Sequence, residues 1–307
     1  MSNDREAPAA VYHAPDGLVE PVISALGDAV IEVRGRLVLA AAPCAEASWW
    51  AANTWFEPAW RRIESIGDGA KWLRSMQRNW AFAGDAYHRR AALLTEKLPP
   101  LRPKPREFPF DVPGSPMGSW TLWDQDWMLA SPRCSSPFAN GEVEFVDHKV
   151  GPPSRAFKKV WEALTLFGRH PVPGERCVDL GAAPGGWTWA LARLGADVVA
   201  VDKAAMAPEV ESLDNVMVRS ESAFALAPAD LGPVDWLFSD VICYPQRLLG
   251  LIERWRAEGA APNFVCTIKF QGSDEHEAAR AFAAIPGARL LHLHHNKHEL
   301  TFLLERG

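Results

Sequence analysis

Cysteine is scarce in this chain, and the few that occur lack the spacing of a metal or redox site. None of the five forms a Cys-x-x-Cys pair or stands among histidines at the spacing of zinc ligands. We therefore expect no metal site, and free thiols in a reducing compartment. The five residues are Cys44, Cys134, Cys177, Cys243 and Cys266.

Long apolar runs are missing as well. The first twenty residues hold no apolar core of signal-peptide length, and no later stretch approaches the ~18 apolar residues of a membrane span. Positive charge does not dominate either, since the net charge is −6, which argues against a wholly basic surface but permits a local basic face. We expect a cytoplasmic monomer that does not insert into membranes.

What the chain does contain is enough apolar material for two compact domains: 48% of its 307 residues are hydrophobic. Residues 1–98 are predicted to form a small α+β domain, with a hairpin of strands near 29–33 and 36–40. A proline-rich connector follows over residues 99–118, too rich in proline for a helix. Residues 119–307 form the second predicted domain.

Basic residues are concentrated between Arg61 and Arg106. Eleven basic residues face four acidic ones there, a net charge of +7 in an acidic chain. The segment also holds Trp72, Trp80, Phe82 and Tyr87, so it could dock RNA through phosphate contacts and base stacking. The alternative is a solvated helix surface over an aromatic core.

The second domain alternates strands and helices, which is typical of a doubly wound, Rossmann-like α/β fold. A helix is predicted to begin at Ser154, as N-cap, and to run through Lys159. A polar turn at Asn296-Lys297 predicts a terminal hairpin that adds one antiparallel strand. The strands are expected near 176–180, 197–202, 214–219, 234–240, 263–269, 288–294 and 298–304.

One ten-residue stretch contains the end of a predicted strand, a glycine turn and the start of a helix. Its sequence is Val178-Asp-Leu-Gly-Ala-Ala-Pro-Gly-Gly-Trp187. A dinucleotide fingerprint would have a glycine where Ala183 stands, and Pro184 removes a backbone donor that a phosphate could use. The turn therefore indicates a nucleotide cofactor without a pyrophosphate. Asp202 ends the next strand, where a ribose diol is usually bound.

Four charged residues should meet in one crevice at the carboxyl ends of the strands. Asp240 and Lys269 end two apolar strands, Glu299 begins the last strand, and Lys159 lies on the helix before the glycine turn. Lys269 follows mostly apolar strand residues, and burying its charge without a partner would be costly. We therefore expect Lys269 to have acidic partners or to act in a functional site. A purely structural ion pair is the alternative.

These motifs resemble the FtsJ-like RNA ribose 2′-O-methyltransferases. The resemblance covers roughly residues 118–307, and within the family it is strongest to the RlmM-type branch that methylates a cytidine ribose of 23S rRNA. It is carried by Pro153-Ser-Arg-Ala-Phe-Lys-Lys159, the glycine stretch, Ser239-Asp240, Ile268-Lys269-Phe-Gln-Gly272 and His298-Glu299-Leu-Thr301.

The resemblance implies S-adenosylmethionine as cofactor, an RNA partner, in particular ribosomal RNA, and a catalytic tetrad of Lys159, Asp240, Lys269 and Glu299. Lys269 would take or orient the hydroxyl proton, Asp240 would position Lys269, and Glu299 and Lys159 would hold the ribose. The implied cofactor-binding residues are Asp179, Gly181, Ala183, Pro184, Gly185, Gly186, Trp187, Asp202, Ser222 and Asp240.

The chain departs from the family pattern in two places. Ser222 stands where the family usually has an acidic residue near the adenine, and the amino-terminal part is short, without a clear match to the THUMP module. Three alternatives stay open: methylation of another RNA such as a cap or tRNA, methylation of a small molecule or protein, and a catalytically silent RNA-binding protein. The pair of lysines and pair of acids favours the RNA ribose enzymes.

Overall fold

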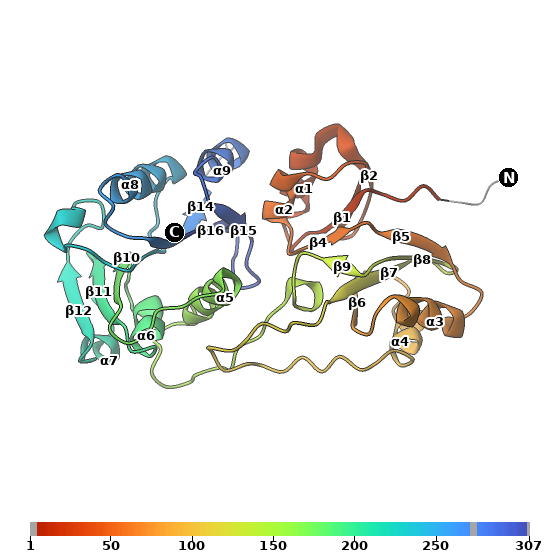
Figure 1. Ribbon diagram of the computed structural model, residues 1–307, viewed down its shortest axis with the longest axis horizontal. Coiled ribbons are helices and arrows are strands. Elements are labelled where there is room, and N and C mark those ends of the chain that lie inside the picture. Colours follow the sequence, from red (N-terminus) through yellow and green to blue (C-terminus); the bar gives the residue numbers. More distant parts are fainter. Residues whose placement is uncertain (1–4, 271–274, 306–307) are drawn as a thin grey trace. The chain divides into compact units, whose positions relative to one another are not determined.

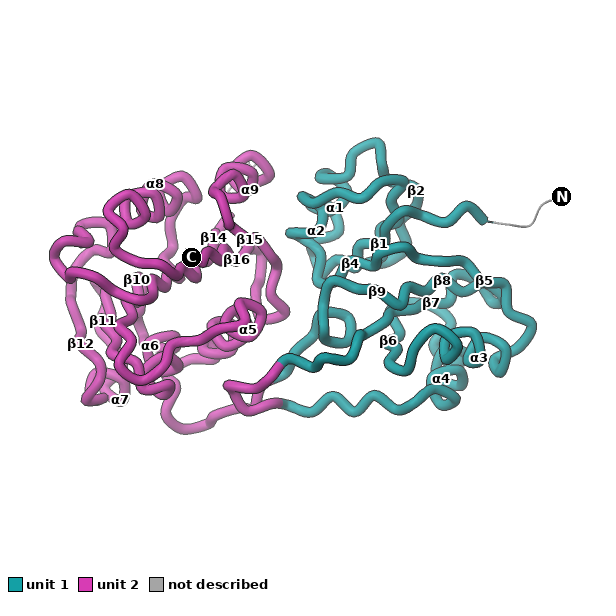
Figure 2. Tube along the Cα trace, in the orientation of Figure 1, with its two compact units in different colours: residues 1–105, 112–144 teal, residues 106–111, 145–307 magenta. Residues whose placement is uncertain are grey.

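The chain folds into two compact units, which the computed structural model describes over residues 5–270 and 275–305. Unit 1 comprises residues 1–105 and 112–144, and unit 2 comprises residues 106–111 and 145–307 (Figure 2). The domain boundary predicted at residue 119 is therefore wrong. Strands β7 (Gly118–Asp124) and β8 (Trp127–Ser131) belong to unit 1, because they complete a sheet with strands from the amino-terminal hundred residues.

Unit 1 contains two antiparallel-rich sheets (Figure 1). The five-stranded sheet has the order β2-β3-β1-β4-β9 and the four-stranded sheet the order β5-β8-β7-β6. The predicted hairpin is confirmed as β2 and β3, which pair antiparallel. The other elements are β1 (Ala10–His13), β2 (Val30–Arg34), β3 (Leu37–Ala40), β4 (Asn53–Phe56), β5 (Ala59–Arg62), β6 (Trp80–Phe82), β9 (Arg133–Cys134), α1 (Val19–Leu26), α2 (Ala45–Trp50), α3 (Ile66–Met76), α4 (His88–Thr95), η1 (Gly27–Ala29) and η2 (Ala139–Gly141).

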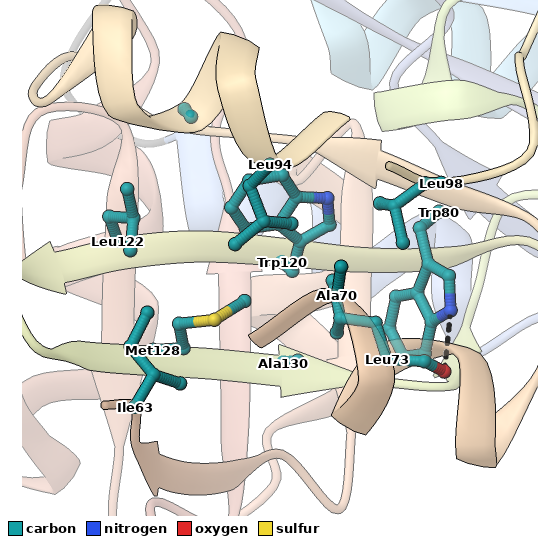
Figure 3. Close-up of a cluster of buried hydrophobic side chains, with 11 residues drawn as sticks. Ile63, Ala70, Leu73, Trp80, Leu94, Leu98, Trp120, Leu122, Met128 and Ala130 are labelled. Atoms are coloured by element: carbon teal, nitrogen blue, oxygen red, sulfur yellow. Dashed lines mark hydrogen bonds between the residues drawn. The ribbon is translucent and has the colours of Figure 1, made fainter. Parts of the chain in front are cut away.

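The aromatic residues of the basic segment mostly form a core rather than a stacking surface. Trp80 is buried in a cluster that includes residues of α3 and α4, and its indole N–H donates to the Leu73 carbonyl oxygen at 3.0 Å (Figure 3). Trp72 and Phe82 pack against the same cluster, and Tyr87 alone of the four is exposed, at 41%. Three of the four aromatics therefore pack on a core, as the alternative expects, while RNA contact by the segment stays a prediction.

Unit 2 is built on a seven-stranded sheet of order β12-β11-β10-β13-β14-β16-β15. The first five strands are mutually parallel, and β16 runs antiparallel to both of its neighbours. This is the predicted Rossmann-like sheet with its terminal hairpin. The strands are β10 (Arg176–Leu180), β11 (Asp197–Asp202), β12 (Val216–Ser220), β13 (Trp236–Ser239), β14 (Asn263–Lys269), β15 (Arg289–Leu291) and β16 (Glu299–Glu305).

Helices cover both faces of this sheet: Figure 1 shows α8 and α9 on one side and α5 and α6 on the other. Helix α5 begins at Phe157 with Ala156 as its N-cap, two residues later than the predicted N-cap Ser154. Ser154 lies before the helix, and its hydroxyl accepts from the Ala156 N–H at 3.4 Å. The helices are α5 (Phe157–Phe167), α6 (Gly186–Ala192), α7 (Pro208–Glu211), η3 (Pro228–Asp230), α8 (Pro245–Ala257) and α9 (Glu275–Ala283).

Strands β10, β13 and β14 are buried along almost their whole length, as the central strands of a parallel sheet should be. Asp179, Ser239 and Lys269 stand at or next to the carboxyl ends of these strands, the edge at which parallel sheets bind ligands. Across the described ranges, no helix has the length and apolarity needed to cross a bilayer. Among the same residues, no His, Cys, Asp and Glu side chains group in threes to hold a metal.

Candidate active site

The four charged residues predicted for the crevice do meet. The Lys159 ammonium lies 2.5 Å from Glu299 Oε1 and 3.4 Å from Asp240 Oδ1. The Lys269 ammonium lies 2.8 Å from Asp240 Oδ1 and 3.8 Å from Glu299 Oε2. Each carboxylate thus bridges both lysines, and the formal charge of the four side chains is zero. We call this group the tetrad.

Sheet register and helix position bring the tetrad together. Lys269 is the last residue of β14, and Glu299, the first of β16, is its direct partner across the antiparallel pair. Asp240 follows β13, the parallel neighbour of β14, and Lys159 reaches the site from α5. Lys159 and Glu299 are buried, at 9% and 8% exposure, whereas Asp240 and Lys269 are partly exposed. The tetrad therefore has a closed side and a side open to a substrate.

The glycine turn leaves β10 with backbone geometry that only glycine adopts readily. Gly181 has φ +79°, and a Cβ there would lie 2.7 Å from the Val241 Cα. Gly185, with φ +115°, packs against Met206 and Val210. Gly186 opens α6, and a Cβ there would lie 2.5 Å from the Ser154 hydroxyl oxygen. The turn is thus closely packed on the segments around it.

Asp202 anchors the turn to β11. Its Oδ2 accepts from the Ala183 N–H at 3.1 Å, and its Oδ1 accepts from the Ala204 N–H at 2.9 Å. Each carboxylate oxygen can still accept a second hydrogen bond. The carboxylate is thereby fixed at the rim of a cavity beside the turn.

This cavity of about 230 Å³ lies over the carboxyl ends of β10, β11 and β13. Gly181, Asp202 and Ser222 of the predicted residues line it. The prediction missed all eight other wall residues. Glu221 was signalled by its place beside Ser222, and its carboxylate is paired with Arg219 at 2.5 Å. The missed residues are Val201, Lys203, Glu221, Ala223, Phe224, Val241, Ile242 and Arg247.

The other seven predicted cofactor residues do not line this cavity, and two of them, Trp187 and Asp179, have buried side chains. The remaining five are Ala183, Pro184, Gly185, Gly186 and Asp240. Trp187 is buried in α6 against Phe238. The Asp179 side chain is fully buried, and its Oδ2 accepts from the Thr188 hydroxyl at 2.7 Å. Its Oδ1 has no hydrogen-bond partner among the described residues. Burial raises the pKa of Asp179 from 3.8 to about 7, with the nearby Asp240 and Asp202 carboxylates acting in the same direction.

The raised pKa of Asp179 makes stability depend on pH. Between pH 3.8 and about 7 the unfolded chain has released this proton while the folded protein keeps it, so the free energy of unfolding should fall as pH rises. At about 1.4 kcal/mol per pKa unit, the loss is at most ~4 kcal/mol. Urea unfolding at pH 5 and pH 8 should show this loss diminished in Asp179→Asn, and an unchanged pH dependence in that variant would contradict the assignment.

Comparison with known proteins gives a family match within unit 2. A family model described as FtsJ-like methyltransferase matches residues 152–257, a span that holds Lys159, the glycine turn and Asp240. The chain is 30% identical to ribosomal RNA large subunit methyltransferase M of Xanthomonas oryzae pv. oryzae over 256 residues, which cover 78% of this chain and 70% of that protein. The similarity therefore extends beyond the matched domain.

Two further relatives carry the same name. The chain is 36% identical to the Halorhodospira halophila protein over 162 residues, 50% of this chain and 47% of the relative. It is 36% identical to the Laribacter hongkongensis protein over 201 residues, 60% of this chain and 53% of the relative. The matches thus span about half the length of these two proteins.

Solved structures show weaker likenesses. A Lactococcus lactis structure assigned as a hemolysin is 19% identical with a TM-score of 0.42, covering 52% of this chain and 91% of that one. A Plasmodium falciparum structure assigned as a ribosomal RNA methyltransferase is 15% identical with a TM-score of 0.37, covering 50% and 97%. The strand order of unit 2, and not these likenesses, defines its fold.

Proposed function

The chain belongs to the FtsJ-like methyltransferases, in the family of ribosomal RNA large subunit methyltransferase M, and from this premise we propose that it methylates a ribose 2′-hydroxyl of RNA, with S-adenosylmethionine as methyl donor. The tetrad beside the glycine turn is the observation that carries the proposal, because a ribose hydroxyl needs both deprotonation and alignment. We propose large-subunit ribosomal RNA as the substrate, since the relatives are named for it, and the cytoplasm as the place of action.

The cavity beside the turn fits a nucleoside-bearing cofactor without a pyrophosphate. Gly181 keeps the floor of the cavity open, and Asp202 can accept from the hydroxyls of a ribose at its rim. Ser222 and Glu221 offer polar groups to an adenine at the far end. When bound, S-adenosylmethionine would supply a methyl group on a positively charged sulfur. The sulfur is a good leaving group when an oxygen nucleophile takes the methyl group.

The tetrad can prepare that nucleophile. In its neutral form the Lys269 amine would accept the 2′-hydroxyl proton, which would leave the oxygen as the nucleophile for the methyl group that S-adenosylmethionine would supply. The ammonium that forms stays paired with Asp240 at 2.8 Å. Lys159 offsets one of the two carboxylate charges from the buried side. The tetrad therefore carries a net charge of −1 while Lys269 is neutral, and this charge returns to zero when Lys269 takes the hydroxyl proton.

The experiment that tests this proposal is methyl transfer from labelled S-adenosylmethionine to an unmodified large-subunit ribosomal RNA transcript. We expect label in the RNA with the intact chain and with no other protein present. Label in tRNA or in protein but not in the ribosomal transcript would overturn the substrate, and absence of label from every acceptor would overturn the activity.

We also propose that the basic segment of unit 1 contacts the RNA through phosphates. Arg74, Arg78 and Arg89 are exposed, although the Arg74 guanidinium also donates to the Lys97 carbonyl oxygen at 2.6 Å. Arg90 is paired with Asp126 at 3.7 Å and is best left unchanged. Changing the three exposed arginines to glutamate should weaken RNA binding and lower its salt dependence by up to about one unit of slope per lost contact. Cofactor affinity should not change, and an unaltered salt slope would identify the segment as a solvated surface only.

A further inference from the structure

Glu162 is a buried carboxylate that the proposed chemistry does not use. It lies one helical turn after Lys159 on α5 and is only 1% exposed. Its Oε1 accepts from the His294 backbone N–H at 2.7 Å. Its Oε2 accepts from the His295 backbone N–H at 3.0 Å and lies 2.7 Å from His295 Nδ1. A buried carboxylate is costly unless it is satisfied in this way.

The partners of Glu162 belong to residues 292–298, the connection between β15 and β16, and this connection ends at Glu299. Hydrogen bonds inside the connection couple the two ends. His292 Nε2 lies 2.9 Å from the Lys297 carbonyl oxygen, and the Lys297 N–H donates to Glu299 Oε1 at 3.4 Å. The Asn296 amide donates to the Glu299 carbonyl oxygen at 3.3 Å. A shift of the connection would therefore move the Glu299 carboxylate.

Glu162 thus joins helix α5 to the connection between β15 and β16. The shortest contact of the tetrad lies between side chains that these two elements position. Helix α5 carries Lys159, the connection leads into Glu299, and their charged atoms lie 2.5 Å apart. His292 is buried at 8% between these groups; burial lowers its pKa, and the Glu162 and Glu299 carboxylates both act against that effect. Both carboxylates therefore act electrostatically on the same imidazole, whose Nδ1 has no hydrogen-bond partner among the described residues.

We propose that Glu162 is a positioning residue of the tetrad, which holds the connection between β15 and β16 on α5 and so fixes Glu299 against Lys159. The inference rests on the methyl transfer proposed above. It assigns Glu162 no contact with substrate or cofactor. Its role is to keep Glu299 within reach of both lysines during the reaction.

The test is Glu162→Gln, which keeps the size of the side chain but presents an amide group to the donors of the connection. In a single-turnover assay with enzyme in excess over ribosomal transcript, the rate of methyl transfer should fall at least ~10-fold, because small displacements at a reacting site are costly. RNA affinity and S-adenosylhomocysteine affinity should stay within about twofold of wild type, since neither site is touched. An unchanged rate would overturn the proposal.

A double-mutant cycle separates positioning from general stabilisation. If Glu162 acts through Glu299, then adding Glu162→Gln to Glu299→Gln should lower the rate by less than about twofold further. An equal loss in both backgrounds would show that Glu162 is structural only. A wild-type chain that transfers no methyl group would overturn the proposed function instead, so the two failures are distinguishable.

Two further variants serve as controls for a loss of rate that is caused by misfolding. Thr165→Val, on the same helix, removes a buried hydroxyl that bonds to the Trp161 carbonyl oxygen at 2.8 Å, and it should leave the rate unchanged. His295→Asn removes the ring contact while keeping both backbone bonds to Glu162, so it should fold even where Glu162→Gln does not. It should lower the rate by a few fold and show the same non-additivity with Glu299→Gln; full additivity would overturn the proposal.

Discussion

Replacing Lys269 with alanine should lower methyl transfer by at least ~10²-fold, the low end for a positioned acid–base group. The substitution removes the amine that lies 2.8 Å from Asp240 and leaves the glycine turn and Asp202 in place. Binding of S-adenosylhomocysteine, measured by calorimetry, should therefore stay close to wild type. A large loss of cofactor affinity would instead place Lys269 in the cofactor site.

Lys269→Arg is the sharper variant, because a guanidinium keeps the positive charge but does not accept a proton. It can still pair with Asp240 and Glu299, so the folded protein should be retained. We expect its rate to fall nearly as far as that of the alanine variant. Near-normal transfer would exclude Lys269 as the base and leave it the role of a fixed positive charge beside the ribose.

Gly181→Ala should abolish or severely weaken cofactor binding. The new Cβ would lie 2.7 Å from the Val241 Cα, a backbone atom that cannot swing aside, and the residue would keep φ +79°. The left-handed backbone alone costs on the order of 1–3 kcal/mol for a residue other than glycine. Relief of the clash must move the turn or the chain after Asp240, both of which line the cavity. Calorimetry should show at least ~10-fold weaker binding, which corresponds to about 1.4 kcal/mol.

Gly174→Ala is the matched control for the backbone strain. Gly174 has φ +89°, and a Cβ there would meet no atom within 4 Å. It precedes the amino end of β10, opposite the turn. The two variants should lose similar stability from strain, but Gly174→Ala should bind the cofactor as wild type does. Equal affinities in both variants would show that the Gly181 turn does not shape the cofactor site.

The sheet of unit 2 could be predicted from sequence because its strands are short apolar runs that end in polar residues. Strands of this kind place Asp240 and Lys269 at one edge, and the terminal hairpin brings Glu299 beside Lys269. The domain boundary could not be predicted in this way. The strands around Trp120 and Leu129 have an apolar pattern that fits any sheet, and only their partners β5 and β6 assign them to unit 1.

Glu162 was missed for a different reason. In sequence it is one polar residue on an amphipathic helix, a position that is usually exposed to solvent. Two of its three partners are backbone groups 132 and 133 residues later, and a backbone N–H carries no signature in the residue type. The third, the His295 ring, is equally distant in the sequence. The core packing of Trp80 and Phe82 could not be predicted for a similar reason, because these side chains suit a core as well as they suit RNA.

The central claim is that the tetrad activates a ribose hydroxyl, and the most direct measurement is the position of the transferred methyl group. Ribosomal transcript methylated by the chain would be digested to nucleosides and analysed by mass spectrometry, with the Lys269→Ala variant in parallel. We predict one 2′-O-methyl nucleoside, with the added mass on the ribose fragment, and its loss in the variant. A methyl group on the base fragment, or equal methylation by Lys269→Ala, would contradict the claim.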